Sequence, residues 1–361
     1  MATIRVQHPL EPMNDNAHMI ADTTRRIFRE LGDPQSIKTD DDRHRLWSAL
    51  ETAGLTRAWI PEELNGSGAS LADGFEVARI AGEFAISVPL AETLLGGWLL
   101  QQAGIPVPEG ASTVAPVDVR DRITADAGGA LSGTARAVPF ARNASRIVFM
   151  STRDNHALVG LVDRGLCRIQ EHTNLAGDAR DIVALHDAVP RAMARAAIDF
   201  DTVMLIGAAV RSMQMAGALQ AILDLSVAYA NQRVAFEKPI GKFQAIQHSL
   251  AKLAGEAAAA LAAAGSAADA IASAAQFGGE IFLEVASAKI RAGEAATAAA
   301  AIAHQVHGAI GFSREHVLHR YTHRLWAWRD DFGSESYWAV RLGQLAASNG
   351  ADALWPMLAA R

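Results

Sequence analysis

One long apolar run, residues 203–236, constrains the possible fold more than any other part of the sequence. Its apolar residues lie on most faces of a helix, and such a helix has to be buried inside a protein or a membrane. The uncharged core of the run, residues 203–210, is too short to cross a bilayer, which takes about 20 apolar residues. We therefore expect this helix in the middle of a helical bundle.

The composition of the chain fits a cytoplasmic globular protein. Its 361 residues are enough for two or three domains, half of them are apolar, and the net charge is −6 with a pI near 6.1. A negative chain offers no electrostatic surface for nucleic acid or an anionic membrane, so we expect neither as a partner. Cys167 is the single cysteine, which excludes an intrachain disulfide. The first 18 residues lack the apolar region of a signal peptide.

The pattern of the sequence changes twice along the chain. Helical periodicity comes first, with runs at residues 41–53 and 71–84. Short β-branched runs at residues 146–151, 157–162 and 166–170, separated by Asp, Asn and Gly, then predict strands. Because no helix of any length fits between these runs, we expect an antiparallel sheet that is barrel-like or sandwich-like.

These zones predict a mainly α protein with a middle β domain. Residues 1–111 would form a helical domain, 112–197 a small β-barrel and 198–361 a four-helix bundle. Residues 256–275 are so rich in alanine that they could be a low-complexity linker. Alanine is the best helix former and lets helices approach closely, so a packed bundle helix is the favoured interpretation.

Common catalytic signatures are missing from the sequence, which holds no Walker A motif, GxSxG, HExxH or strand-linked GxGxxG. A cluster of histidines raises the question of a metal site, because three of them would share one face of a helix. Their neighbours are Arg, Thr, Leu and Tyr instead of carboxylates or thiolates. We therefore expect solvated or stacked rings and no metal. The histidines are His304, His307, His316, His319 and His323.

Two helical runs are separated by a break at residues 238–241, with the sequence KPIG. The residues around this break have the features of an anion-binding site. Arg233 offers a forked, permanently charged donor set that suits a phosphate. The helix after the break would begin near Lys242 with free N–H groups and a positive dipole end, and Gln244 would lie in its first turn. An ordinary helix–turn–helix with an exposed arginine explains this stretch equally well.

Resemblance to a known family favours the first interpretation. The pattern R-x-x-F-x-K-P-I-G-x-F-Q-x-x-Q, residues 233–247, is similar to the flavin-binding signature of the acyl-CoA dehydrogenases. Residues 305–312, QVHGAIGF, followed by HRY at 319–321, resemble the Q-x-x-G-G-x-G-F segment of that family and its downstream helix. Trp47 and the Pro-Glu-Glu turn at residues 61–63 resemble its N-terminal helix pair. The matching segments come in family order and span nearly the whole chain.

The resemblance implies a helical N-terminal domain, a small β-barrel and a four-helix bundle, assembled as an oligomer that holds FAD across a subunit interface. By that analogy Arg233 contacts the FAD pyrophosphate of a neighbouring subunit. The small Ala309 replaces the second glycine of the family motif and should still allow a close backbone approach. The implied cofactor contacts are Arg233, Phe236, Phe243, Gln244, Gln305, Val306, His307, Gly308 and Ala309.

The implied reaction is α,β-dehydrogenation of an acyl-CoA thioester, with an electron-transfer flavoprotein as the electron acceptor. A carboxylate removes the α-proton, and such a base works in a dry pocket that raises its pKa. The commonest position of this base in the family falls on Phe332, and the alternative position falls near Gly207. Asp331 and Glu335 are the nearby carboxylates. We predict Asp331 as the base, and a solvated-loop role remains open for both.

Without a carboxylate at either family base position, the chain resembles the shortened subunits of heterotetrameric family members that act on sterol side-chain thioesters. The main hypothesis is a FAD-dependent acyl-CoA dehydrogenase-family protein, in a homo- or hetero-oligomer, of fatty acid or sterol degradation. The rival hypothesis is a non-catalytic or FAD-holding subunit of a heteromeric enzyme. Nothing in the sequence favours a third possibility, a flavin monooxygenase of similar fold. The acyl group itself cannot be predicted, because pocket depth depends on side chains from several helices.

Overall fold

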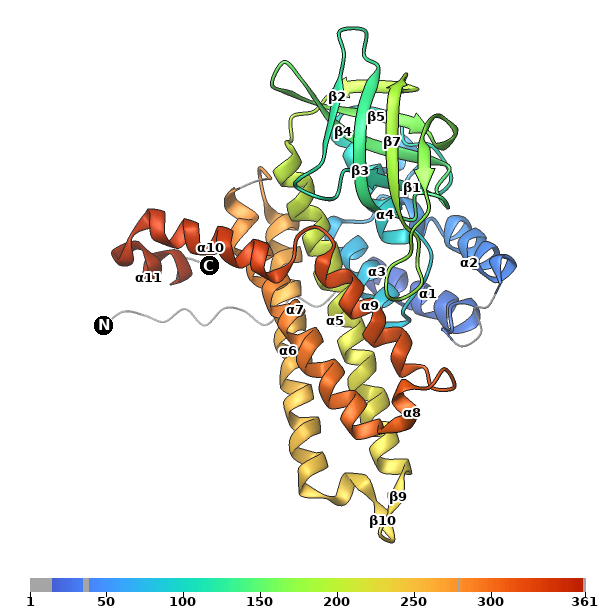
Figure 1. Cartoon of the computed structure of the whole chain (residues 1–361), viewed down its shortest axis with the longest axis vertical. Helices are drawn as coiled ribbons and strands as arrows, with labels where there is room; N and C mark the ends of the chain where they lie inside the picture. The colour runs from blue at the N-terminus through green and yellow to red at the C-terminus, as the bar shows by residue number, and fades with distance from the viewer. Residues whose placement is uncertain (1–14, 35–38, 278, 360–361) are drawn as a thin grey trace.

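A computed structural model describes residues 15–34, 39–277 and 279–359 of the chain. Four helices lead into an eight-stranded sheet, and a long helical bundle follows. Figure 1 shows the sheet at one end of the molecule and the bundle extending away from it. The N-terminal stretch that argued against a signal peptide lies, except for its last four residues, outside the described part of the chain.

The N-terminal helices begin where the sequence supplies capping residues. At the start of α2 the Thr39 hydroxyl accepts from the backbone N–H of Asp42, and the carboxylate of Asp42 accepts from the N–H of Thr39. Ser70 and Asp73 repeat this capping box on α3. The helices expected at residues 41–53 and 71–84 are therefore confirmed to within one residue at either end. The elements of this part are α1 (Asp15–Leu31), α2 (Asp40–Thr52), η1 (Leu55–Arg57), η2 (Glu62–Leu64), α3 (Leu71–Glu83) and α4 (Leu90–Gln102).

The middle sheet is open, with strand order β6-β7-β3-β2-β4-β5-β8 and β1 paired to β4. The expected barrel is therefore wrong, because the two end strands, β6 and β8, do not pair with each other. The expected antiparallel pairing is also only partly right, since β1 and β2 both pair with β4 in parallel. The strands are β1 (Ser112–Ala115), β2 (Arg122–Ala125), β3 (Leu131–Pro139), β4 (Arg146–Arg153), β5 (His156–Asp163), β6 (Arg168–Gln170), β7 (Arg180–Ala188) and β8 (Ala192–Arg195), with η3 (Arg164–Leu166) before β6.

The β4–β5 hairpin matches its sequence prediction most closely. Eight residue pairs connect the two strands, from Arg146 opposite Asp163 to Arg153 opposite His156. The turn consists of Asp154 and Asn155, both with positive φ, as a two-residue hairpin turn requires. β1 in turn fixes the sheet onto α4, because Thr93 exchanges two hydrogen bonds with the backbone of Ser112.

The bundle is built from three long helices and a shorter one, α5 (Phe200–Gln232), α6 (Gln244–Ser273), α7 (Gly279–His307) and α9 (Leu318–Asp330). The alanine-rich run is a packed helix and not a linker, because one face of α6 is buried against alanines of α7. Alanine side chains let these two helices lie close together. Helix α5 has the length and composition of a membrane span, yet its most apolar segment is wholly buried within the protein.

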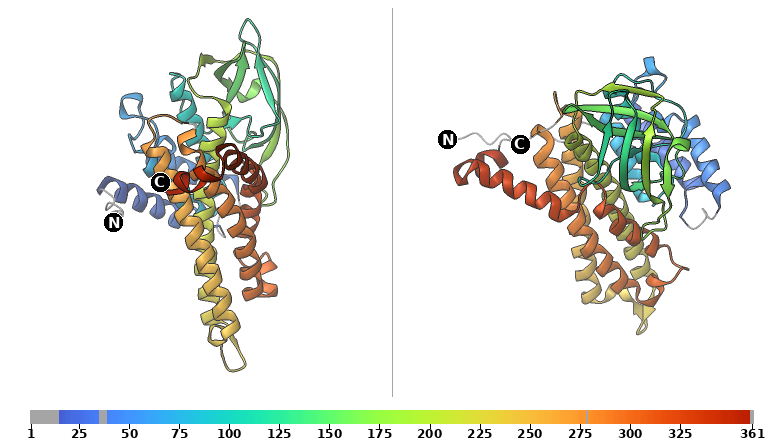
Figure 2. Two further views of the ribbon diagram at one scale, coloured as in Figure 1. Left: turned by 90° about the vertical axis from the view of Figure 1, so that its left-hand side faces the viewer. Right: turned by 45° about the horizontal axis from the view of Figure 1, so that its top comes forward.

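Helices α10 (Glu335–Asn349) and α11 (Ala351–Ala359) leave the bundle and project to the side opposite α1 and α2 (Figures 1 and 2). Helix α11 exposes Leu354, Trp355 and Leu358. An exposed apolar surface of this kind marks an interaction site more often than a bare solvent face.

Helices α3 and α5 cross at two glycines. A Cβ atom on Gly82 would lie 1.9 Å from the carbonyl oxygen of Gln214, and one on Gly217 would lie 1.9 Å from the carbonyl oxygen of Arg79. Both distances are far below van der Waals contact, so the N-terminal helices can lie against the bundle only where these side chains are missing.

We predict that Gly217→Ala destabilises the protein by about 1–3 kcal/mol, because the methyl group forces the two backbones apart. Gly255→Ala is the matched control, since Gly255 lies within α6 with nothing near its missing Cβ. That substitution should be neutral or stabilise by up to about 1 kcal/mol through helix propensity. Urea unfolding of both variants checks the prediction, and equal stabilities would contradict the close crossing.

Candidate functional site

The two segments predicted to contact a flavin meet at the outer end of the bundle. Helix α5 ends at Gln232 with Arg233 as its C-cap, and α7 ends at His307. The ring of Tyr229, one turn before Arg233, stacks on His307 with 4.5 Å between ring centroids. The structure thus brings together segments about 70 residues apart in sequence, as the order of the motifs predicted.

The break between α5 and α6 is a compact hairpin of β9 (Val234–Ala235) and β10 (Lys238–Pro239), followed by η4 (Ile240–Lys242). Its turn residues, Phe236 and Glu237, both have positive φ. A Cβ on Gly241 would lie 3.2 Å from the carbonyl oxygen of Ala230, so a larger residue would crowd the end of α5. Figure 1 shows this hairpin at the far tip of the molecule.

The helix N-terminus after the break is open to an anion. Helix α6 begins at Gln244, two residues later than expected, and no side chain caps it. The first N–H groups of a 30-residue helix therefore point out of its end with the positive end of the helix dipole. Pyrophosphates bind at helix ends of this kind. The donor set fits the phosphates of a dinucleotide cofactor.

Most of the predicted flavin contacts are on the surface. Arg233, Gln244 and Gln305 are exposed, as are Gly308 and Ala309. Phe236 is 88% exposed, and its ring lies edge-on to the half-buried Phe243 at 6.2 Å. Side chains spread over an outer tip would hold a cofactor from one side only.

Val306 and His307 are the buried members of this set. His307 Nδ1 lies 2.8 Å from the carbonyl oxygen of Ala303, while its Nε2 atom has no hydrogen-bond partner in the described part of the chain. The pKa of the His307 imidazole is lowered, mainly because the ring is buried. A buried ring nitrogen without a partner is available to a ligand at this end of the bundle.

The remaining histidines take part in ring contacts. His304 stacks on Phe312 with 4.1 Å between centroids, and His307 lies 4.7 Å from His316. His319 and His323 lie together on α9, but His316 precedes the helix, so the expectation of three histidines on one helical face is wrong. Across the described residues no group of three His, Cys, Asp or Glu could hold a metal.

The two positions at which the family places its base coincide in space. Phe332 is 3% exposed and follows α9, while Gly207 belongs to α5. A Cβ on Gly207 would lie 2.3 Å from Cδ1 of Phe332. The aromatic ring of one position therefore fills the space that the missing side chain of the other leaves. Neither position carries a carboxylate.

A buried charged cluster surrounds this ring. Arg211 is 2% exposed, donates through Nε to Asp331 at 3.0 Å and pairs through Nη2 with Glu92. Arg180 reaches the other oxygen of Asp331 at 3.1 Å. The guanidinium of Arg211 also lies 5.8 Å from the centroid of Phe332. Asp331, the predicted base, is thus beside the base position but in contact with two arginines.

The space beside Phe332 is nearly filled. A cavity of about 10 Å³ remains there, lined by residues of α4, α5 and the sheet, among them Leu95, Val114 and Val210. This volume is about that of one water probe. An acyl chain has no room at this place unless the ring and the charged cluster move.

Two more charged groups fix the loop that carries Phe332. Lys289 is fully buried in α7 and donates to the carbonyl oxygens of Arg329 at 2.6 Å and Gly333 at 2.8 Å. Burial lowers the pKa of this amine to about 8. Glu335, the other candidate base, pairs with Arg329 at 2.6 Å and packs against Gly293 of α7. Its carboxylate therefore has a structural partner.

Sequence reasoning missed Arg211, Glu92 and Lys289. All three are charged residues inside strongly apolar helices, where charges are rarely buried without partners. A charged residue inside an apolar helical run can be recognised in a sequence, but the sequence does not show which residue is its partner.

Comparisons with known proteins agree with this geometry. Residues 189–328 match the family model described as acyl-CoA dehydrogenase, C-terminal domain. Over 319 residues the chain is 28% identical to acyl-CoA dehydrogenase IpdE2 of Mycobacterium tuberculosis, covering 86% of this chain and 91% of that protein. Residues 189–328 therefore match an acyl-CoA dehydrogenase C-terminal domain, and the chain resembles acyl-CoA dehydrogenases over most of its length.

Solved structures of acyl-CoA dehydrogenases share the fold of this chain. The ChsE4-ChsE5 complex from Mycobacterium tuberculosis has a TM-score of 0.84 at 21% identity, covering 94% of this chain and 99% of that one. Butyryl-CoA dehydrogenase from Megasphaera elsdenii has a TM-score of 0.80 at 17% identity, covering 93% and 99%. The expected order of helices, sheet and helical bundle is confirmed.

We predict that Arg211→Leu destabilises this acyl-CoA dehydrogenase-like chain by about 3–5 kcal/mol, because it leaves two buried carboxylates without their shared cation. Arg45→Ala is the control, since Arg45 forms an exposed pair with Asp42 on α2. Exposed pairs contribute about 0–1 kcal/mol. Chemical denaturation of both variants measures the difference, and a loss below about 1 kcal/mol in Arg211→Leu would contradict the cluster's structural role.

Proposed function

We propose that this chain is a FAD-holding subunit of an acyl-CoA dehydrogenase that carries out α,β-dehydrogenation of an acyl-CoA thioester. A partner subunit would supply the carboxylate that removes the α-proton. Family membership supports an oxidoreductase acting on an acyl-CoA. The structural likeness to a complex of two chains supports an oligomer.

One observation carries this proposal. Both family positions for the base are occupied by groups that cannot accept a proton, Phe332 and Gly207, and the ring of one fills the space beside the other. The flavin segments at the far tip keep their donors exposed. A chain with an open cofactor surface and a filled acyl site fits the role of completing a site on another subunit.

The residues of the tip fit the cofactor's parts. Arg233 and the uncapped N-terminus of α6 would hold the pyrophosphate by charge and backbone N–H groups. The exposed ring of Phe236 offers an apolar face, and Gln305 offers amide donors and acceptors. When bound, FAD supplies the hydride acceptor of the reaction. The protein's own contribution here is to bind and orient.

The buried cluster has a different task in this proposal. The pairs between Arg211, Glu92 and Asp331 keep the loop after α9 closed against α5. Phe332 keeps water and thioester out of this chain's own base position. Chemistry would then take place only where the partner's site is open.

Other parts of the assignment follow the family. We propose an electron-transfer flavoprotein as the acceptor of the electrons and the cytoplasm as the location. A fatty or sterol acyl group is the substrate class that the likeness to a steroid acyl-CoA dehydrogenase structure supports.

We predict that Arg233→Gln weakens FAD binding by the assembled enzyme about 10- to 100-fold, since a charge-assisted hydrogen bond contributes about 1.5–3 kcal/mol. The flavin-to-protein ratio after gel filtration and a titration with FAD measure this change. Arg45→Gln, on the N-terminal helix α2, is the control and should retain the cofactor. Unchanged FAD affinity in Arg233→Gln would contradict the proposed surface. The assembled enzyme is prepared by co-expression of this chain with a candidate partner subunit.

Asp331 as the base of this chain stays a prediction that one variant pair can decide. Asp331→Asn and Glu92→Gln each remove one carboxylate from the same guanidinium. If both are structural, each variant loses stability while turnover per bound flavin stays within about twofold, which is what we expect. A loss of about 100-fold or more in Asp331→Asn alone is the size of a missing general base, and would make Asp331 the base.

A further inference from the structure

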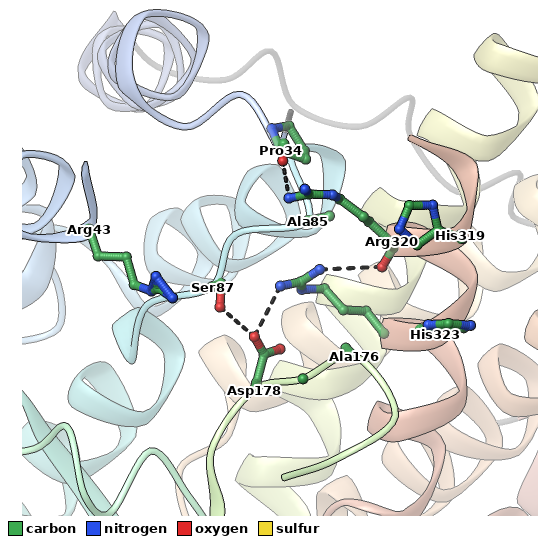
Figure 3. A pocket seen from close by; sticks show the side chains of 11 residues that line it. Pro34, Arg43, Ala85, Ser87, Ala176, Asp178, His319, Arg320 and His323 are labelled. Carbon is green, nitrogen blue, oxygen red and sulfur yellow. Dashed lines mark hydrogen bonds and ion pairs between the residues drawn. The ribbon is translucent and has the colours of Figure 1, made fainter. Parts of the chain in front are cut away.

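A second hollow lies on the flank of α9, away from all nine residues assigned to the flavin. Its volume is about 290 Å³, and it is walled by α9, by the loop between α3 and α4, and by the loop that enters β7 (Figure 3). Pro34, in the turn after α1, and Arg43 of α2 close a further side. The elements that form it come from all three parts of the chain.

The lining of this hollow is rich in nitrogen donors. Figure 3 shows His319, Arg320 and His323 along one wall, with Arg43 reaching in from the other. Arg320 donates through Nη1 to the carbonyl oxygen of Pro34. Its guanidinium lines the hollow and carries further N–H donors.

Arg324 is the most buried cation of the group. It donates to Asp178 at 3.0 Å and to the carbonyl oxygen of Arg320 at 3.3 Å. Its Nε–H is buried and has no acceptor among the described residues. An unsatisfied donor on a buried cation costs stability, so an acceptor in this hollow would be favourable.

The negative charges around the hollow are fewer and already engaged. Asp178 accepts from Ser87 Oγ as well as from Arg324, and Arg43 lies 3.5 Å from the exposed Asp40. Asp33 acts on Arg320 from outside the lining, yet burial and the charge of Arg324 still lower the pKa of that guanidinium. Arg320 is therefore a cation with too little negative charge near it.

A larger hollow of about 470 Å³ adjoins the first and shares Arg43, Ser87, Gly177 and Asp178 with it. Its further lining is mixed, because Trp47, Val88, Pro89 and Phe140 lie beside the polar Asp40, His44, Arg142, Asn143 and Thr173. The polar chamber and this adjoining chamber form one two-part space.

We propose that the polar chamber binds the phosphate group of a small organic phosphomonoester, with its apolar part in the adjoining chamber. Three arginines and two histidines outnumber the carboxylates there, and planar guanidinium groups match a phosphate better than a single charge does. A phosphate offers several acceptor oxygens, enough for Arg320, Arg324 Nε–H and Arg43 together. The aromatic side chains of Trp47 and Phe140 suit an organic part that contains a ring.

Calorimetric titration of the full chain with phenyl phosphate and with inorganic phosphate, at constant ionic strength, tests this proposal. We expect saturable binding of phenyl phosphate that is tighter than that of inorganic phosphate. No saturable binding of either would overturn the site. Equal affinity for the two would overturn the role of Trp47 and Phe140 in the adjoining chamber.

Two arginines on the same helix provide a matched pair of variants. Arg43→Gln should weaken phenyl phosphate binding about tenfold, while Arg45→Gln, which faces away from both chambers, should leave it unchanged. Arg320→Gln, checked for folding by circular dichroism, should weaken it at least as much. Arg233→Gln should have no effect, because its site is the flavin surface. Equal losses in Arg43→Gln and Arg45→Gln would overturn the assignment.

Discussion

One buried guanidinium holds the three parts of this protein together. Arg211 on α5 pairs with Glu92 of α4 and with Asp331 after α9, and Asp331 also pairs with Arg180 of β7. The N-terminal helices, the sheet and the bundle therefore meet at a single charged cluster. Because buried ions are costly unless each has its partner, this cluster fixes how the three parts are placed relative to one another.

The same cluster decides what the chain can do. It holds the loop that carries Phe332 against Gly207, and Lys289 holds that loop from the other side. The place where the family keeps its base and its thioester is thereby closed. At the opposite end of the bundle, Arg233, Gln244 and Gln305 face outward. In the proposed function, a partner subunit completes a chain that has a closed acyl site and an open cofactor surface.

Local sequence features predicted the helices well. Capping residues such as Thr39 and Ser70 mark where helices begin, and the Pro-Gly break marks the turn where α5 ends. The topology of the sheet could not be predicted from the sequence, because parallel pairing of β1 with β4 depends on contacts between residues distant in sequence. The resemblance to the acyl-CoA dehydrogenases placed the two base positions at Phe332 and near Gly207. Only the packing of α5 against the loop after α9 shows that one ring fills both.

The central claim is that this chain has no acyl site of its own. An anaerobic absorbance titration of the chain purified alone, supplied with FAD and then with acyl-CoA thioesters from short fatty to sterol-like, tests it most directly. The account predicts that the flavin absorbance band stays unbleached with every thioester, because Phe332 and the Arg211 cluster fill the base position. Bleaching of the band by the chain without any partner would contradict it.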